Sequence, residues 1–274
     1  MTIHVYTSFT YSYLNRARVL TDGIKRHHPD CILWAVLTDA PPEDLCHDWS
    51  EERFDRVLTA EDLFEGEAEA WLFGHDIVEA CTAVKGAAAL RILAEPGCEK
   101  LVYFDPDIAL FNPIDEIIDL LDDYDIVLTP HQIMPEPQNA RQAIIDNEVT
   151  SLSHGAYNLG FLAIANRGEG RRCAAWWADR LHDWCHDRRD IGIFVDQKWC
   201  DLVPCFFDNV RIHRDPGCNV ASWNLSHRQV RVDDAGQIRV NGVPLRFYHF
   251  TKLGPIGDTM TQRYARGNTE VYEL

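Results

Sequence analysis

The segment from Leu101 to Ile108 constrains the fold of this chain more than any other. A run of strand-forming residues ends there in two carboxylates, Asp105 and Asp107, with Pro106 between them. Alternate residues of an extended chain share a face, so the two carboxylates can point the same way. A buried strand that delivers two acids to its carboxyl end can hold a divalent cation. A strand that ends in a solvated acidic turn explains the segment equally well.

Strands and helices are predicted to alternate along the first half of the chain. Residues 3–7 and 32–37 have the apolar side chains of buried strands, and residues 14–27 have apolar positions at helical spacing. This order indicates a right-handed βαβ unit and a parallel sheet. Further along we expect a strand at 56–58, a helix at 78–93 and a strand at 100–104.

The second half of the chain continues the same pattern with more loops. We expect helices at 114–121 and 170–186, strands at 125–129, 160–165, 210–212 and 245–250, a hairpin at 229–243 and a loop at 130–142. No linker, repeat or low-complexity segment interrupts the sequence. The prediction is therefore one α/β domain spanning residues 1–274, with a mixed central sheet flanked by helices.

The charge balance excludes several classes of partner. The 274 residues include 26 basic and 43 acidic side chains, for a formal net charge of −17. Such a chain is not expected to bind nucleic acid or anionic lipid through bulk electrostatics. A polyanionic ligand would need a local basic site or a metal ion.

Targeting signals are not evident in the sequence. The amino terminus has no basic region followed by a long apolar stretch, and no apolar run approaches the roughly 18 residues that span a bilayer. The nine cysteines are an odd number without Cys-x-x-Cys pairs, which indicates reduced thiols. We therefore expect a cytoplasmic protein without a transmembrane segment.

Three later segments carry polar groups that an apolar core does not require. Asn158 and Gly160 precede a buried strand, where the glycine either allows close approach of a ligand or forms a turn. Asp196 and Gln197 lie between large hydrophobic residues, and Asp196 read alone is equally well a helix cap. His249 shares a strand face with apolar residues, so by itself it is more simply a core histidine.

Taken in order, these segments resemble the GT-A glycosyltransferases, particularly the retaining family-8-like galactosyl and glucosyl transferases and the glycogenins. The resemblance covers about residues 3–255 and includes an Asp-x-Asp motif, an Asn-x-Gly strand, an Asp-Gln element and a late histidine. It implies a nucleotide-binding half, residues 1–129, and a sugar and acceptor half, residues 130–274. One departure is that a Gly-x-Lys-Pro-Trp stretch does not follow His249, although Lys252 is nearby.

The resemblance also implies roles for individual residues. Mn²⁺ or Mg²⁺ would be held by Asp105, Asp107 and His249. Asp196 and Gln197 would be catalytic and face the donor sugar. The nucleotide-diphosphate sugar, which is the donor substrate, would be bound by Tyr6, Thr7, Ser8, Lys85, Phe104, Asp105, Asn158 and Lys252. Read alone, the two lysines in this set are ordinary solvated lysines.

The function implied is metal-dependent transfer of a sugar from a nucleotide-diphosphate sugar, with UDP as the expected nucleotide and retention as the expected stereochemistry. The acceptor would be a glycan or a lipid-linked glycan in the assembly of a bacterial surface polysaccharide. In an inverting enzyme Asp196 would be the general base. The loop at 130–150 could be a lid, and Trp223 a pocket residue. The tail at 259–274 has two arginines, which gives weak support for peripheral membrane contact.

Three other functions are consistent with parts of the sequence. A sugar-nucleotide pyrophosphorylase would need a glycine-rich loop after its first strand, and residues 7–11 contain no glycine. A glycoside hydrolase needs two carboxyl groups roughly 5–9.5 Å apart, whereas acids at i and i+2 suit metal chelation. The alternative kept is a catalytically degenerate GT-A fold that binds a carbohydrate or a partner protein.

Overall fold

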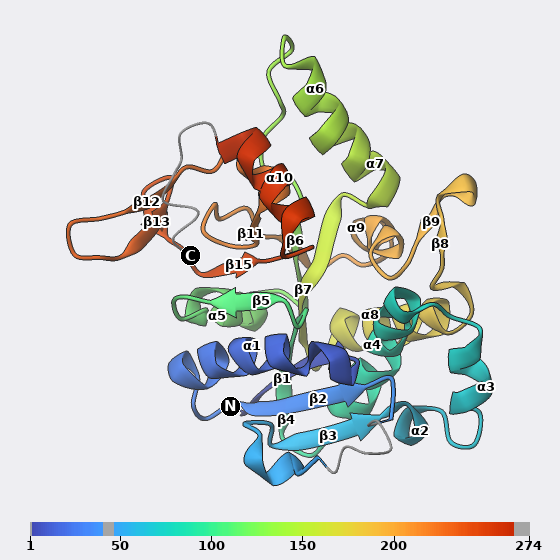
Figure 1. Ribbon diagram of the computed structural model, residues 1–274. Helices are drawn as coiled ribbons and strands as arrows, with labels where there is room; N and C mark the ends of the chain where they lie inside the picture. Colours follow the sequence, from blue (N-terminus) through green and yellow to red (C-terminus); the bar gives the residue numbers. More distant parts are fainter. Residues whose placement is uncertain (1, 41–46, 266–274) are drawn as a thin grey trace.

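A seven-stranded mixed sheet forms the centre of the protein, for which a computed structural model describes residues 2–40 and 47–265 (Figure 1). The strand order is β10-β6-β7-β4-β1-β2-β3. Its strands are β1 (Thr2–Phe9), β2 (Ile32–Leu37), β3 (Arg56–Thr59), β4 (Cys98–Phe104), β6 (Ile126–Pro130), β7 (Tyr157–Ala165) and β10 (Val210–Ile212). Only β7 runs against its neighbours, β4 and β6, so the sheet is mixed as predicted.

Helices cover both faces of this sheet. On one face pack α1 (Leu14–His27) and α5 (Asp115–Asp123), and on the other α4 (Ile77–Leu93) and α8 (Gly168–Trp184). Alternate residues of β1 point to the two faces, with Val5 packed toward α1 and Tyr6 toward α4. The sheet therefore separates two hydrophobic cores, and the predicted βαβ unit of β1, α1 and β2 is confirmed.

Smaller elements surround the carboxyl ends of the parallel strands. The remaining strands are β5 (Ile108–Leu110), β8 (Asp187–Arg188), β9 (Ile193–Phe194), β11 (Val220–Ala221), β12 (Val230–Val232), β13 (Ile238–Val240), β14 (Val243–Pro244) and β15 (Phe247–His249). The remaining α-helices are α2 (Ala60–Leu63), α3 (Ala68–Phe73), α6 (Arg141–Ala143), α7 (Thr150–His154), α9 (Val203–Phe206) and α10 (Pro255–Ala265). The strands β11, β15 and β5 form a separate three-stranded sheet, which matters for the site below.

The prediction of a loop at 130–142, extended to residue 150 as a lid, is wrong in part. Residues 141–154 are helical, comprising α6, a π-helical segment (Ile144–Val149) and α7, and this helix projects at the top of Figure 1. Its inward face carries Ala143 and Asn147, whereas Ile145, Val149 and Leu152 are exposed. The sequence does hold a helical signal, because Ile145, Val149 and Leu152 stand at helical spacing, but in the structure this apolar stripe faces solvent and not the core.

The other predicted elements are present with shifted ends. The strand expected at 160–165 begins at Tyr157, and the one expected at 245–250 covers only β15. The hairpin around residues 234–236 is confirmed as β12 and β13. The last nine residues of the predicted tail, 266–274, lie outside the described residues.

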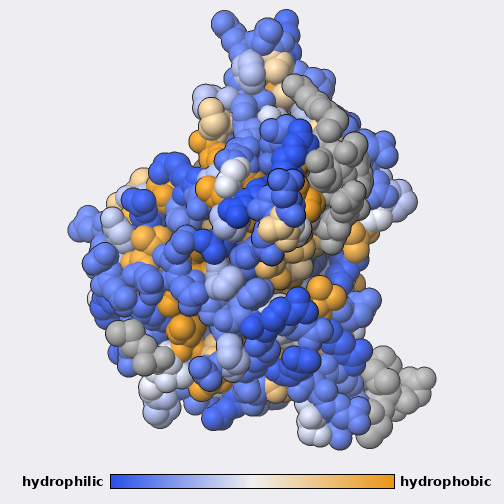
Figure 2. Space-filling model, turned by 90° about the vertical axis from the view of Figure 1, so that its left-hand side faces the viewer, coloured by the Kyte–Doolittle hydropathy of each residue, from blue (hydrophilic) through white to orange (hydrophobic). Residues whose placement is uncertain are grey.

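The surface agrees with the composition. Figure 2 shows a face on which hydrophilic residues predominate, with hydrophobic residues scattered among them. Eight of the nine cysteines lie in the described residues, and all eight are free thiols. Across the parts of the chain that the structure describes, every helix falls short of the length and apolar content that crossing a bilayer requires.

Candidate metal centre

Three metal-ligating side chains meet at the carboxyl end of β4. Asp105 and Asp107 follow the strand directly, and β15 pairs antiparallel with β5, which places His249 opposite Ile108. His249 Nε2 lies 3.1 Å from Asp107 Oδ1 and 3.7 Å from Asp105 Oδ2. One ligand atom from each of the three residues lies within 4.8 Å of the others. The two extended segments therefore bring together residues that are over 140 positions apart in the sequence.

The donor set fits a divalent cation. Two carboxylates and one imidazole, clustered at the end of a sheet, match the oxygen-rich coordination of Mg²⁺ and Mn²⁺. The imidazole favours Mn²⁺ of the two. A strand ending in a solvated turn would not hold its two acids against a buried histidine, so the geometry favours the metal-binding interpretation of the Asp-x-Asp motif.

Asp105 is held so that one of its oxygens remains available. Its Oδ1 accepts hydrogen bonds from Lys85 Nζ (2.9 Å) and Tyr103 Oη (2.6 Å). The other oxygen, Oδ2, faces His249. Tyr103 was not among the predicted site residues, but it lies two residues before Asp105 on the same face of the extended chain, and this alternation could have identified it. The fixed carboxylate presents Oδ2 to a cation without reorganisation.

The tautomer of His249 is set by Asn158. The backbone N–H of Gly160 donates to Asn158 Oδ1 (3.2 Å), which identifies that atom as the amide oxygen. His249 Nδ1 lies 3.1 Å from the same oxygen and must donate to it. Neutral His249 therefore carries its proton on Nδ1, and the lone pair of Nε2 faces Asp107 and Asp105. The prediction that Asn158 contacts the donor sugar remains a prediction, because both of its amide atoms already have protein partners.

Asp107 and His249 shift each other's proton affinity. Burial raises and His249 lowers the pKa of Asp107, with a net lowering. Burial opposes a charge on His249, but Asp107 and then Asp105 raise its pKa above the ordinary value of 6.5. A bound cation would take the place of the proton on Nε2.

Lys85 connects the metal ligands to the Asp-Gln element. Its side chain is 2% exposed, and Nζ donates to Asp105 (2.9 Å), to Asp196 Oδ2 (2.8 Å) and to the carbonyl of Leu159 (3.2 Å). Burial opposes the charge of Lys85, but the two carboxylates raise its pKa. Burial raises the pKa of Asp196, which Lys85 counteracts. All three ammonium protons are used, so a contact of Lys85 with donor phosphates would have to replace one of these bonds.

Asp196 is not the helix cap that the sequence allowed. The following 3-10 helix (Lys198–Leu202) has Gln197 at its N-cap, and the Asp196 carboxylate points to Lys85 instead. Gln197 is almost buried, and its Nε2 donates to the carbonyl of His154 (3.0 Å). Its Oε1 has no protein donor among the bonds of the described residues, so this atom is the free polar end of the Asp-Gln element.

The predicted nucleotide-binding residues of β1 line the space around Lys85 only in part. Tyr6 Oη donates to the carbonyl of Lys85 (3.1 Å), and Ser8 Oγ donates to the carbonyl of Cys81 (2.6 Å). Thr7 is fully buried, and because successive side chains of a strand alternate between its faces, it points to the opposite face of the sheet from Tyr6 and Ser8. Phe104 packs against other phenylalanines in the core, which leaves its side chain unable to contact a nucleotide. Lys252 is exposed, three residues beyond His249, in a backbone conformation with φ of 52°.

Two further aromatic residues border the metal centre. The ring centroid of Trp223 lies 5.2 Å from that of His249 and 5.8 Å from that of His131. The predicted pocket residue Trp223 is thus beside the site. His131 was not predicted. It follows β6, whose carboxyl end meets the same edge of the sheet as that of β4, and this position could have identified it.

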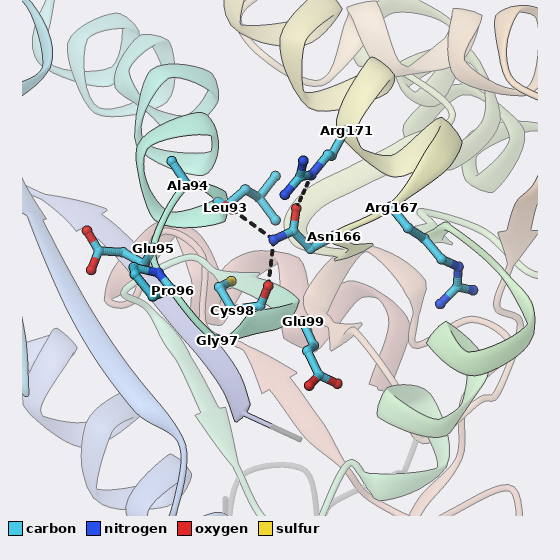
Figure 3. Close-up of a pocket in the computed structure, with 10 residues that line it drawn as sticks. All are labelled: Leu93, Ala94, Glu95, Pro96, Gly97, Cys98, Glu99, Asn166, Arg167 and Arg171. Atoms are coloured by element: carbon cyan, nitrogen blue, oxygen red, sulfur yellow. Dashed lines mark hydrogen bonds between the residues drawn. The ribbon is translucent and has the colours of Figure 1, made fainter.

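Two cavities of the protein lie away from the metal centre. A cavity of about 540 Å³ is lined by residues 93–99 together with Asn166, Arg167 and Arg171 (Figure 3). Asn166 closes it by donating to the carbonyls of Leu93 (2.8 Å) and Cys98 (2.5 Å). Cys98 begins β4, so this cavity is at the end of the strand opposite to Asp105. A second cavity of about 490 Å³ lies between α4 and α8.

Several solved structures with a similar fold are glycosyltransferases. No protein family and no curated protein matches the sequence itself. The structure of the galactosyltransferase LgtC in complex with donor and acceptor sugar analogs is 16% identical, with a TM-score of 0.54 over 98% of this chain and 96% of that one. Mouse xyloside xylosyltransferase 1 is 15% identical, with a TM-score of 0.51 over 93% and 99%. A glycosyltransferase involved in glycosylation of the major capsid of PBCV-1 is 9% identical, with a TM-score of 0.50 over 97% and 98%.

These similarities confirm the predicted fold class. The chain has the mixed α/β fold of the GT-A glycosyltransferases, and its acid-tipped strand, late histidine and buried lysine lie at the carboxyl edge of that fold's sheet. Identities this low show the fold and not the substrate.

Gly160 leaves the space that His249 occupies. A Cβ at this position would lie 2.5 Å from His249 Cε1 and 2.6 Å from Nδ1. We expect Gly160→Ala to displace the imidazole and to weaken Mn²⁺ binding about tenfold or more, as measured by calorimetric titration of the free protein. Gly74→Ala is the control, because its Cβ would make only an ordinary contact of 3.4 Å. Equal Mn²⁺ affinities in the two variants would contradict the assignment of His249 as a ligand.

Lys85→Met should destabilise the fold because it leaves two carboxylates without their buried partner. The expected loss is about 3–5 kcal/mol in the free energy of urea unfolding, the cost of breaking a buried ion pair. Lys198→Met is the matched control, since the Lys198–Asp201 pair (2.8 Å) is about a quarter exposed and should contribute about 1 kcal/mol or less. Similar losses in both variants would show that the Lys85 bridge is energetically unimportant.

His131 should make stability depend on pH. Burial lowers its pKa from 6.5 to about 4, so below 6.5 the unfolded chain takes up a proton that the folded chain does not. Stability is therefore lost as the pH falls through this range. Between about pH 7.5 and 5, wild type should lose about 2 kcal/mol more unfolding free energy than His131→Gln, because groups common to both cancel. If wild type and His131→Gln lose the same unfolding free energy between the two pH values, the lowered pKa of His131 is refuted.

Proposed function

We propose that this protein is a metal-dependent glycosyltransferase that uses a nucleotide-diphosphate sugar, with UDP as the nucleotide. The observation that carries the proposal is the cluster of Asp105, Asp107 and His249 at the carboxyl edge of a sheet with the glycosyltransferase fold. The acceptor would be a glycan or a lipid-linked glycan in the assembly of a surface polysaccharide. The protein would act in the cytoplasm, with peripheral contact to a membrane when the acceptor is lipid-linked.

A metal ion bound by Asp105, Asp107 and His249 would neutralise the negative charge that grows on the diphosphate as the glycosidic bond breaks. The chain itself has few cations to do this, because its net charge is −17 and Lys85 is engaged by two carboxylates. Lys252, which is exposed near His249, is a candidate for a contact with the diphosphate. The ligand geometry and the charge balance thus both support metal dependence, with Mn²⁺ as the expected ion.

The environment of Asp196 supports transfer with retention. An inverting enzyme needs a base near the acceptor hydroxyl, but the Asp196 side chain is 3% exposed and bonded to Lys85. In a front-face substitution the leaving phosphate accepts the acceptor's proton, so no protein base is required. Asp196 then acts through its charge and its bond to Lys85, while Gln197 Oε1 is free to accept a hydrogen bond from a sugar hydroxyl.

The two halves of the chain would divide the donor between them. Residues 1–129 contain Lys85 and the Asp-x-Asp motif, and residues 130–274 contain the Asp-Gln element and His249. The metal centre is completed only where the halves meet, so the diphosphate would lie at this junction. The solved neighbours include a galactosyltransferase with sugar analogs and a xylosyltransferase, which supports transfer of a sugar without specifying which one.

Nucleotide binding tests the proposal directly. We expect UDP to bind in calorimetric titration more tightly with Mn²⁺ than without it, and more tightly than GDP or CDP. Asp107→Ala should remove the effect of Mn²⁺, because one of three protein ligands is lost. Asp119→Ala, a change at an exposed acid on α5, should leave it intact. If no nucleotide binds wild type under any of these conditions, the chain is instead a degenerate fold that binds another partner.

Gln197→Ala should reduce turnover more than nucleotide affinity. Its amide is positioned to bind the sugar, whose hydroxyl contacts strengthen as the bond breaks, whereas the nucleotide lies on the metal side. We expect the rate of UDP release from UDP-glucose or UDP-galactose to fall tenfold or more, with the Kd for UDP nearly unchanged. An unchanged turnover number would remove Gln197 from the sugar site.

A further inference from the structure

We propose that His131 is a positioning residue for the metal centre and acts on His249 through Asn158. The proposal rests on the metal-dependent function proposed above and adds a residue to its site. His131 does not touch the expected metal position. Its contribution is to fix the amide that determines which nitrogen of His249 is available.

The direction of each hydrogen bond follows from atoms that can act in one way only. Asn158 Oδ1 accepts from the backbone of Gly160 (3.2 Å), so the other end of the amide is Nδ2, a donor. Nδ2 lies 3.2 Å from His131 Nε2, which must therefore accept. At the opposite end, Asn158 Oδ1 accepts from His249 Nδ1 (3.1 Å). The chain of bonds thus runs from His249 through Asn158 to His131.

The ring of His131 is suited to this role because it is neutral and held in place. Burial lowers its pKa to about 4, so Nε2 keeps its lone pair at neutral pH. The backbone N–H of His131 donates to the carbonyl of Ala156 (2.9 Å), and its carbonyl accepts from Asn224 Nδ2 (3.3 Å). Trp223 packs its ring against the rings of both histidines. These contacts come from two separate segments of the chain, around Ala156 and around Trp223–Asn224, and they hold the acceptor beside the amide.

Loss of this acceptor would release Asn158 on one side. The amide would keep its bonds to Gly160 and His249, but Nδ2 would be buried without a partner and could rotate to find one. Rotation of Asn158 would move the atom that orients His249. Partners of this kind, one bond removed from a metal ligand, typically change metal affinity by 10–100-fold when removed.

Two substitutions at position 131 separate this role from a general effect on packing. Glutamine places an amide oxygen near the location of Nε2, whereas asparagine is one methylene shorter and cannot reach Asn158. We expect His131→Gln to keep the Mn²⁺ Kd of the free protein within about threefold of wild type. His131→Asn should weaken it about tenfold or more. Calorimetry and electron paramagnetic resonance of free Mn²⁺ measure these constants without enzymatic activity, and circular dichroism confirms folding.

A spectroscopic measurement reports on His249 itself. In a metal-free sample at a pH above its pKa, long-range ¹⁵N–¹H spectra of histidine-labelled protein should show His249 protonated on Nδ1. Replacing His131 by asparagine should add a population protonated on Nε2, and replacing it by glutamine should not. A packing defect alone would not distinguish the two variants in this way.

The outcomes also separate this proposal from the function on which it rests. If wild type binds Mn²⁺ and Asp107→Ala does not, the metal centre stands, and equal affinities for the asparagine, glutamine and wild-type proteins would overturn the role of His131. If wild type fails to bind Mn²⁺, the metal centre itself is wrong. In that case the ¹⁵N measurement on metal-free protein still decides whether His131 controls the His249 tautomer.

Discussion

The buried ammonium group of Lys85 is the interaction on which the rest of the site depends. It lies between Asp105 and Asp196 and also bonds to the carbonyl of Leu159, so it joins β4, β7 and the segment before the Lys198–Leu202 helix. Without this ammonium group, it would be strongly unfavourable to bury two carboxylates and a carbonyl oxygen next to one another. Because Lys85 is on α4, the position of that helix against the sheet also sets the distance between the two acids.

The second constraint is the pairing of β5 with β15. These short strands form their own sheet with β11 and add a histidine to the edge of the main sheet. The histidine can approach only because position 160 has no side chain. The Asn-x-Gly motif thus supplies both the amide that orients the imidazole and the empty space beside it, which explains the two-residue spacing on one face of β7.

Much of this could be predicted from the sequence, and the exceptions have physical reasons. Buried strands and amphipathic helices such as α1 can be predicted from the periodicity of their apolar residues. The two acids after β4 can be recognised because they follow an apolar run directly. The helix at 141–154 has a sequence signal in the helical spacing of Ile145, Val149 and Leu152, but the expectation that such a stripe faces the core fails, because these side chains face solvent. The engagement of Lys85 by two acids, and the role of His131, depend on contacts between residues 20 or more positions apart, which no local pattern encodes.

The unequal attachment of the two acids has a consequence for how such a chain could change over time. Asp105 is bonded to Lys85 and Tyr103 and so belongs to the scaffold as well as to the site, whereas the close ion pair of Asp107 in the described part of the chain is with His249. A descendant could lose its metal through position 107 and keep a sound fold. A change at position 105 would remove one of the two carboxylates that neutralise the buried Lys85. A relative that had given up catalysis for binding would therefore be expected to retain the first acid and the lysine, and to differ at the second.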